Sequence, residues 1–151
     1  AGDEKIGSII GKGSGVGRKL KDQFLKSLPS LAALLTKVGK AAKAEHVRGL
    51  DGRRVRVRSE HAALNSLLQS AGAIVMKQAL VLAAARLDAL GFPYKLVAQV
   101  HDEFQIEVPD AYAERVGIVF RNAIRKSGLH FNMRCPLDGD YKVGDNWSQT
   151  H

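Results

Sequence analysis

The residues best suited to chemistry lie in VAQVHDEFQIEV (97–108), where an imidazole and two adjacent carboxylates interrupt alternating apolar residues. His101, Asp102 and Glu103 therefore fall at the predicted tip of a hairpin whose strands bury one face. Two ionised carboxylates are costly to hold together unless a cation compensates them, and Mg²⁺ binds carboxylate oxygens. Because side chains alternate along a strand, one carboxylate is the predicted ligand and the other its neighbour. A polar hairpin turn without a metal explains the same pattern.

A second pattern is a polar stripe on an apolar segment. His61, Asn65 and Gln69 recur every four residues, which places them on one face of a helix. Amide donors on such a face suit the minor groove of DNA, where every correct base pair presents acceptors in nearly equivalent places. A solvated helix face is the alternative interpretation.

A third pattern is a run of alternating arginines. Arg54, Arg56 and Arg58 share one predicted face of a short strand, with Val55 and Val57 on the other. Arginines in this arrangement bind a phosphate backbone and make DNA binding dependent on salt. A charged edge that discourages aggregation is the alternative.

Hairpins and helices must position these side chains. Asp51-Gly52 predicts a turn between short alternating runs, and Ser59 caps a predicted helix over 60–90 that Gly91 and Pro93 end. The segment 110–127 has helical spacing and stops near Gly128, and a last strand is predicted over about 130–137. Strand pairs that alternate with single helices predict an α+β fold with helices on one face of a sheet.

The N-terminal part is predicted to be helical. Acidic residues favour a short helix over 3–10, and apolar spacing over 18–44 predicts two helices separated by Pro29. The connector GKGSGVG (11–17) lacks the phosphate-loop pattern and is predicted to be a hinge.

Composition limits the class of protein. The first 60 residues carry all of the formal charge of +8, which predicts a polyanionic partner, while the remaining residues are neutral. Cys135, the single cysteine, excludes an internal disulfide and a cysteine-rich zinc site, and favours a reducing compartment. The longest apolar run, 79–85, is too short to span a membrane.

Three blocks of sequence follow one another in a particular order: DGRRVRVRSEHAALNSLLQSAGAIVMK, VAQVHDEFQIEVP and VGDNWSQTH. In this order they resemble the C-terminal third of a family A (DNA polymerase I-like) DNA polymerase, and SEHAALNSLLQSAGA and VHDEFQIE are similar to its bacteriophage replicative branch. The opening GDEKIGSIIG and RKLKDQFLKSLPSLAAL resemble helices of the fingers that follow the nucleotide-binding helix. The resemblance covers nearly all 151 residues.

The resemblance implies roles for individual residues. Asp102 corresponds to the metal-binding aspartate of the family's third catalytic motif, Glu103 to its acidic neighbour, and His101 lies beside the primer terminus. On the polar stripe, Asn65 and Gln69 match residues that probe the minor groove of the primer-template.

The resemblance also extends to His61 and to the run of arginines. His61 stands where many relatives have arginine. The run of arginines formed by Arg53, Arg54, Arg56 and Arg58 resembles a palm hairpin that faces the DNA backbone. The implied fold is an antiparallel palm sheet (two hairpins plus a C-terminal strand) backed by helices, with a short N-terminal helical fingers segment.

The family's mechanism uses two Mg²⁺ ions, which activate the primer 3′-hydroxyl and stabilise the leaving pyrophosphate. It also needs a second aspartate from a DYSxIExR-like strand and a helix that grips the nucleotide, and the sequence contains neither. The resemblance therefore implies a fragment that supplies one metal ligand and is inactive alone. Residues 1–46 are then the helical end of the fingers and residues 47–151 the C-terminal part of the palm.

The implied partners are primer-template DNA, dNTP in the full enzyme and a missing N-terminal polymerase portion, with no membrane. The implied location is the cytoplasm of a phage-infected or prophage-carrying bacterium. Apolar surface on the 60–82 helix, normally covered by the missing polymerase, predicts a homo-oligomer. The alternatives are a non-catalytic DNA-binding module or split-polymerase subunit, and a metal-dependent nuclease that uses His101 and Asp102.

Overall fold

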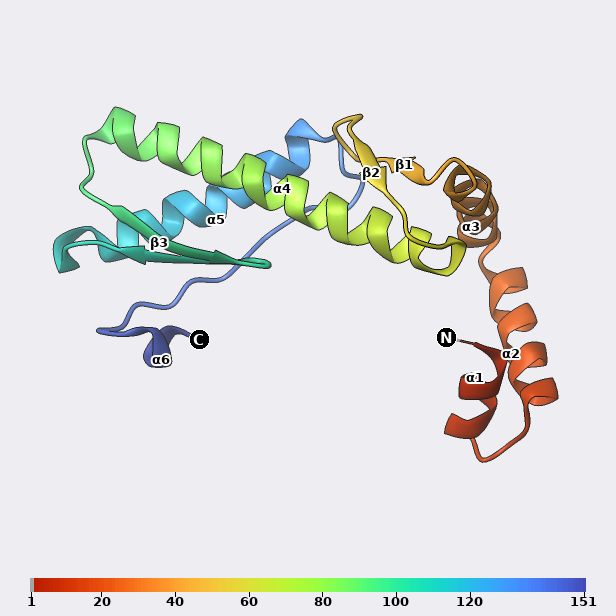
Figure 1. The fold of residues 1–151 in the computed structure, drawn as a ribbon. Coiled ribbons are helices and arrows are strands. Elements are labelled where there is room, and N and C mark those ends of the chain that lie inside the picture. Colours follow the sequence, from red (N-terminus) through yellow and green to blue (C-terminus); the bar gives the residue numbers. More distant parts are fainter. Residues whose placement is uncertain (1) are drawn as a thin grey trace. The chain divides into compact units, whose positions relative to one another are not determined.

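The chain folds into helices and two short β-hairpins, which is an α+β arrangement (Figure 1). The structure is a computed structural model that describes residues 2–151. In chain order its elements are α1 (Asp3–Ile9), α2 (Ser14–Ser27), α3 (Pro29–Ala42), β1 (His46–Arg48), β2 (Arg54–Arg56), α4 (Glu60–Leu90), β3 (Lys95–Val100), β4 (Glu103–Glu107), the 3₁₀ helix η1 (Asp110–Tyr112), α5 (Ala113–His130) and α6 (Trp147–Thr150).

The chain divides into two compact units. The first runs to Val47 and includes Arg56–Leu64, and the second comprises Arg48–Val55 and Asn65–His151. Strand β1 pairs with β2, and β3 pairs with β4 in an antiparallel register with an irregularity between Leu96 and Ala98.

Capping residues explain where the long helix begins and ends. Ser59 accepts a hydrogen bond from the backbone N–H of Ala62 at the start of α4. At its end Gly91 adopts a φ of 63°, and the N–H of Phe92 bonds back to the carbonyl of Leu87 at 3.1 Å. This is the αL termination that glycine permits at low cost, so the predicted helix over 60–90 is confirmed.

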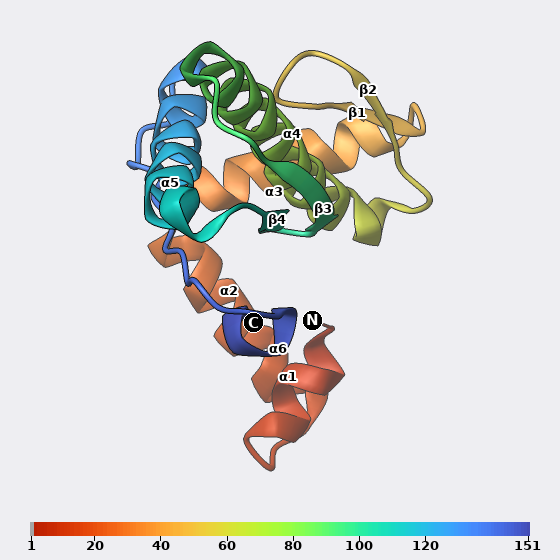
Figure 2. The ribbon, with the colours of Figure 1, turned by 90° about the vertical axis from the view of Figure 1, so that its left-hand side faces the viewer.

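The core of the second unit lies between α4 and α5, with the β3–β4 hairpin beside them (Figures 1 and 2). Small alanines and one leucine of α4 meet an apolar stripe of α5. From β4, Phe104 packs on Phe120 with ring centroids 5.2 Å apart. The buried residues of this core are Ala79, Ala83, Leu87, Val116, Phe120 and Ala123.

The predicted C-terminal strand over 130–137 is wrong. Helix α5 continues through Gly128 to His130, and Asn132 then takes a φ of 52°. The N–H of Met133 bonds to the carbonyl of Gly128, so this helix ends in a Schellman-type cap with asparagine in the αL position. Asparagine tolerates this conformation, and the chain leaves the cap without pairing to a strand.

The prediction that both strands of the second hairpin bury one face holds only for β4. Phe104 and Ile106 of β4 are half-buried and pack on the core, whereas Leu96 and Val100 of β3 are each 42% exposed and Val97 is 61% exposed. Within the described residues β3 has a single neighbouring strand, and a two-stranded sheet buries little apolar surface by itself.

Helix α4 is also strongly apolar. Of the described helices it alone is long and apolar enough to cross a membrane, with a mean hydropathy of 1.5 over 18 residues. The core helix of a soluble protein passes the same test. In this structure 28% of that window is buried, so packing of the alanines and of Leu87 against α5 accounts for only part of its apolar character.

Candidate active site

A two-residue turn forms the tip of the β3–β4 hairpin. His101 and Asp102 connect the paired residues Val100 and Glu103, and both turn residues are exposed. His101 has a φ of 53°, a left-handed conformation uncommon for residues other than glycine. The turn therefore carries Asp102 outside the ladder, where strand alternation no longer fixes its direction.

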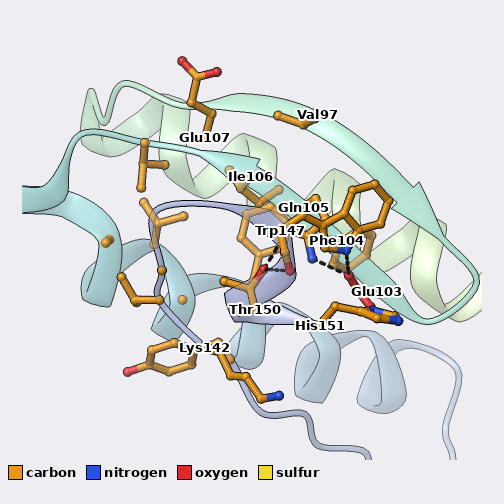
Figure 3. A pocket seen from close by; sticks show the side chains of 18 of the residues that line it. Val97, Glu103, Phe104, Gln105, Ile106, Glu107, Lys142, Trp147, Thr150 and His151 are labelled. Carbon is orange, nitrogen blue, oxygen red and sulfur yellow. Dashed lines mark hydrogen bonds and ion pairs between the residues drawn. The ribbon is translucent and has the colours of Figure 1, made fainter.

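Asp102 lines a cavity of about 840 Å³. Residues of β4, α5 and the C-terminal segment form most of its wall (Figure 3). Across residues 2–151 its carboxylate has no hydrogen-bond or ion-pair partner. Both of its oxygens are thus available to a cation or to water.

The carboxylate of Glu103, in contrast, is fully engaged (Figure 3). Gln105 Nε2 and Trp147 Nε1 donate to Oε1, the latter at 3.0 Å, and His151 Nδ1 lies 2.9 Å from Oε2. The hydrogen bonds from Gln105, then His151 and then Trp147 hold the pKa of Glu103 below its ordinary value. Glu103 is therefore an ionised carboxylate whose orientation is fixed by its donors.

The C-terminal helix α6 supplies residues that sequence reasoning did not assign to the site. The Trp147 indole and the His151 ring meet edge to face, with centroids 6.3 Å apart, and Thr150 Oγ1 donates to Gln105 Oε1 at 3.2 Å. In the sequence this segment belongs to VGDNWSQTH, one of the three blocks that carry the family resemblance, but that block assigned no site role to Trp147 or His151. Its docking on the hairpin joins residues more than 40 positions apart.

The side chains at the hairpin tip can supply part of a binding site for a hard cation. Mg²⁺ is bound through one or two carboxylates and keeps several waters, so a single free aspartate is a suitable protein ligand. The described residues contain no cluster of three or more His, Cys, Asp or Glu side chains that would enclose a metal. Asp102 is therefore the residue of this tip that can hold such an ion, and further ligands have to come from other molecules or segments.

The polar stripe lies on one continuous helix. His61, Asn65 and Gln69 are all exposed on α4, and residues four apart on a helix are neighbours on its surface. In the described part of the chain no hydrogen bond links Asn65 or Gln69 to the hairpin tip. The stripe thus presents one imidazole and two side-chain amides on the surface of α4.

The predicted alternation of arginines and valines is confirmed. Arg54, Arg56 and Arg58 are exposed, while Val55 is half-buried and Val57 is buried.

Arg53 has a different position from the alternating arginines. Its Nε donates to Asp51 Oδ2 at 2.7 Å and its Nη2 lies 2.6 Å from the same oxygen, a bond that lowers the pKa of Asp51. Arg53 therefore stabilises the turn before β2.

The sequence profile of DNA polymerase family A matches residues 4–149. The chain belongs to DNA polymerase family A. Among its relatives, the DNA-directed DNA polymerases of Enterobacteria phage T3 and Escherichia phage T7 are each 38% identical over 173 aligned residues. These alignments cover 100% of the chain and 25% of each phage enzyme. The thermostable DNA polymerase I of Thermus thermophilus is 30% identical, with 83% of the chain and 16% of that enzyme covered.

The fold agrees with the family A assignment. The polymerase domain of Pol1 from M. smegmatis, solved in complex with DNA primer-template and dNTP, superimposes with a TM-score of 0.72 at 19% identity, covering 83% of this chain and 24% of that one. The chain spans about a quarter of the length of the phage relatives it matches. Family A DNA polymerases are generally metal-dependent, in keeping with an aspartate that is free to bind a cation.

Proposed function

We propose that this chain is part of a DNA-directed DNA polymerase that adds deoxynucleotides to a primer 3′ end by two-metal phosphoryl transfer. The observation that carries the proposal is a partnerless aspartate, Asp102, at the tip of a hairpin in a family A chain. Relatives named as DNA-directed DNA polymerases support it. Asp102 is the proposed protein ligand of Mg²⁺, which when bound activates the primer hydroxyl and stabilises the charge on pyrophosphate.

The remaining site residues bind and orient the nucleic acid in this proposal. Glu103 provides a fixed negative charge beside Asp102, and His101 at the exposed turn faces the primer terminus. The exposed stripe on α4 probes the minor groove, which requires donors but no base-specific contacts. Exposed arginines on and after β2 hold the phosphate backbone.

The exposed apolar residues of β3 support the proposal that the chain is part of a larger protein. Its exposed apolar residues Leu96, Val97 and Val100 are the surface that a further strand or helix of a polymerase covers. We assign residues 1–46 to the helical end of the fingers and residues 47–151 to the palm, with primer-template DNA, dNTP and the remaining polymerase as partners. The proposed location is the cytoplasm of a phage-infected or prophage-carrying bacterium, and the proposal is supported by relatives that come from phages and bacteria.

Primer extension by a polymerase that contains this segment tests the proposal. Asp102→Asn keeps the shape of the side chain and removes its charge, so Mg²⁺ loses its proposed ligand. We expect kcat to fall on the order of 10³-fold, which corresponds to about 4 kcal/mol of lost transition-state stabilisation. Glu107→Gln, in the same hairpin with its exposed carboxylate paired to Lys95, is the matched control and keeps its activity. Full activity of Asp102→Asn would contradict the proposed metal ligand.

A non-catalytic DNA-binding module or split-polymerase subunit is the second candidate, and the exposed arginines favour it for the isolated chain. We expect the isolated chain to bind primer-template without extending it. The logarithm of the binding constant should fall linearly with the logarithm of the salt concentration, and Arg56→Ala should reduce the slope by about 0.9. Robust Mg²⁺-dependent synthesis by the isolated chain would show instead that it is a complete catalyst.

A further inference from the structure

The C-terminal segment is fixed to the second unit at several points before it reaches the hairpin tip. The ring of Tyr141 packs on Gly117 of α5 so closely that a Cβ there would overlap it, and Tyr141 Oη donates to Glu114 Oε2 at 2.8 Å. Arg125 of α5 forms two hydrogen bonds, of 2.9 and 2.6 Å, to Asp138. The segment is thus held along α5 before it turns into α6.

From this segment, Trp147 contacts one carboxylate oxygen of the site. Its indole Nε1–H donates to Glu103 Oε1 at 3.0 Å (Figure 3). An indole is a donor only and has a rigid ring, so this bond, together with those from Gln105 to the same oxygen and from His151 to the other, restricts the direction of the carboxylate. Asp102, one residue earlier, has no such donor in the described residues.

We propose that Trp147 is a positioning residue, which holds Glu103 through its indole N–H so that the carboxylate beside Asp102 keeps one orientation during catalysis. This inference rests on the proposed function, since the effect of the orientation is measured as the rate of polymerisation. Residues that orient the groups around a metal site are often worth roughly 10- to 100-fold in activity.

The isolated chain tests the contact without any need for activity. Trp147 is the only tryptophan, so the ¹H–¹⁵N spectrum contains a single indole cross-peak. We expect this peak to lie away from the position of an unbonded indole and to move to that position in Glu103→Ala. Asp102→Ala, the matched control at the neighbouring carboxylate, should leave it in place.

A second variant keeps the contact test decisive. Glu103→Gln retains an acceptor oxygen but no charge, and it should move the indole peak in the same direction by a smaller amount. A wild-type peak at the unbonded position, or a peak that neither Glu103 variant moves, would overturn the contact.

The polymerase that contains this segment tests the role. Trp147→Phe keeps an aromatic ring and removes the donor, so kcat should fall roughly 10- to 100-fold while KM for primer-template stays within about twofold. Ser148→Ala is the control, because the Ser148 hydroxyl bonds only to Asn146 within the tail. Unchanged kcat in Trp147→Phe overturns the positioning role, whereas a wild-type enzyme unable to extend a primer refutes the proposed function and leaves the indole result standing.

Discussion

Asp102 and Glu103 are neighbours in the chain, yet their oxygens have entirely different surroundings. Asp102 belongs to the turn and lines an open cavity, while Glu103 begins β4 and accepts hydrogen bonds from Gln105 and Trp147. An acceptor whose oxygens are already paired is a poorer cation ligand than a free one, because its bonds must first be broken. Asp102 is therefore suited to bind a cation, and Glu103 to remain a negative charge held by its donors.

Asp138 permits a test of electrostatics far from the hairpin tip. The bidentate contact with Arg125, followed by the N–H of Gly139, lowers the pKa of Asp138 from 3.8 to about 2. Because the folded-state pKa is depressed, the stabilisation is complete above about pH 5 and is lost as the pH falls through 3.8 toward 2.

Thermal unfolding of Asp138→Asn and wild type between pH 7 and 3 measures this contribution. We expect the variant to have the lower Tm at pH 7, and the difference to narrow below about pH 4, because the Asp138 carboxylate gains its proton first in the unfolded chain, near 3.8, and only near 2 in the folded one. A difference that stays constant down to pH 3 would contradict the ion pair.

At the scale of elements, close packing on α5 determines where the irregular C-terminal segment lies. Tyr141 packs on Gly117 and Leu137 on Gly128, and in both places an added Cβ would collide with the side chain of the segment. Side chains larger than hydrogen at these helix positions would leave no room for the segment. The position of α6, and with it of Trp147, depends on these two contacts.

Gly117→Ala separates docking of the segment from stability of the helix. Alanine favours the helix by about 1 kcal/mol over glycine, while overpacking costs about 1–3 kcal/mol. We therefore expect Tm to stay level or to fall, with a net loss of at most about 2 kcal/mol in the free energy of unfolding, together with a shift of Trp147 fluorescence toward that of an exposed indole.

Gly72→Ala is the matched control, since a Cβ at Gly72 in α4 meets nothing within 4 Å. It should stabilise the chain by about 1 kcal/mol without changing the fluorescence. Unchanged fluorescence in Gly117→Ala would show that Tyr141 does not anchor the segment.

The contact of α4 with α5 provides a test of the core. Leu87 is fully buried, so Leu87→Ala should lower the free energy of unfolding by about 2–5 kcal/mol in urea denaturation. Leu68→Ala, on the same helix at 57% exposure, should change it by about 0.5 kcal/mol or less. Equal losses in the two variants would contradict the observed packing of α4.

For the whole molecule, the distribution of charge and the exposed apolar surface both indicate that the chain binds partners. The formal charge of +8 arises within the first 60 residues, and the site carboxylates lie in the neutral remainder. The apolar surface predicted on the 60–82 helix is present, since Leu68 is 57% and Val81 is 62% exposed. Such residues are covered in a larger protein or in a contact between copies.

We propose that the isolated chain forms homo-oligomers through the face of α4 that contains Val81. This face lies about 160° around the helix from Asn65, so the contact does not compete with DNA on the stripe. Light scattering at high concentration should show a mass above 16.4 kDa, reduced to the monomer by Val81→Lys. Leu129→Lys, at a 75% exposed site on α5, is the control, and a strictly monomeric wild type would refute the proposal.

Elements whose signals are local could be predicted from the sequence. Helical spacing, the caps Ser59 and Gly91, the break between α2 and α3 just before Pro29, and the polar hairpin tip at 101–102 need only neighbouring residues, and the structure has all of them. The predicted strand over 130–137 failed because its apolar residues lack a neighbouring strand, and the Asn132 cap is specified by backbone geometry that composition does not encode.

The difference between the two carboxylates arises from contacts between segments far apart in the sequence. Trp147 and His151 reach Glu103 across 44 and 48 positions of sequence, through a segment without periodicity. Contacts of that kind depend on packing against Gly117 and on the course of the chain after α5, which no local pattern records. The sequence therefore identifies the acidic tip, and the fold determines which acid is free to bind a cation and which is held in place.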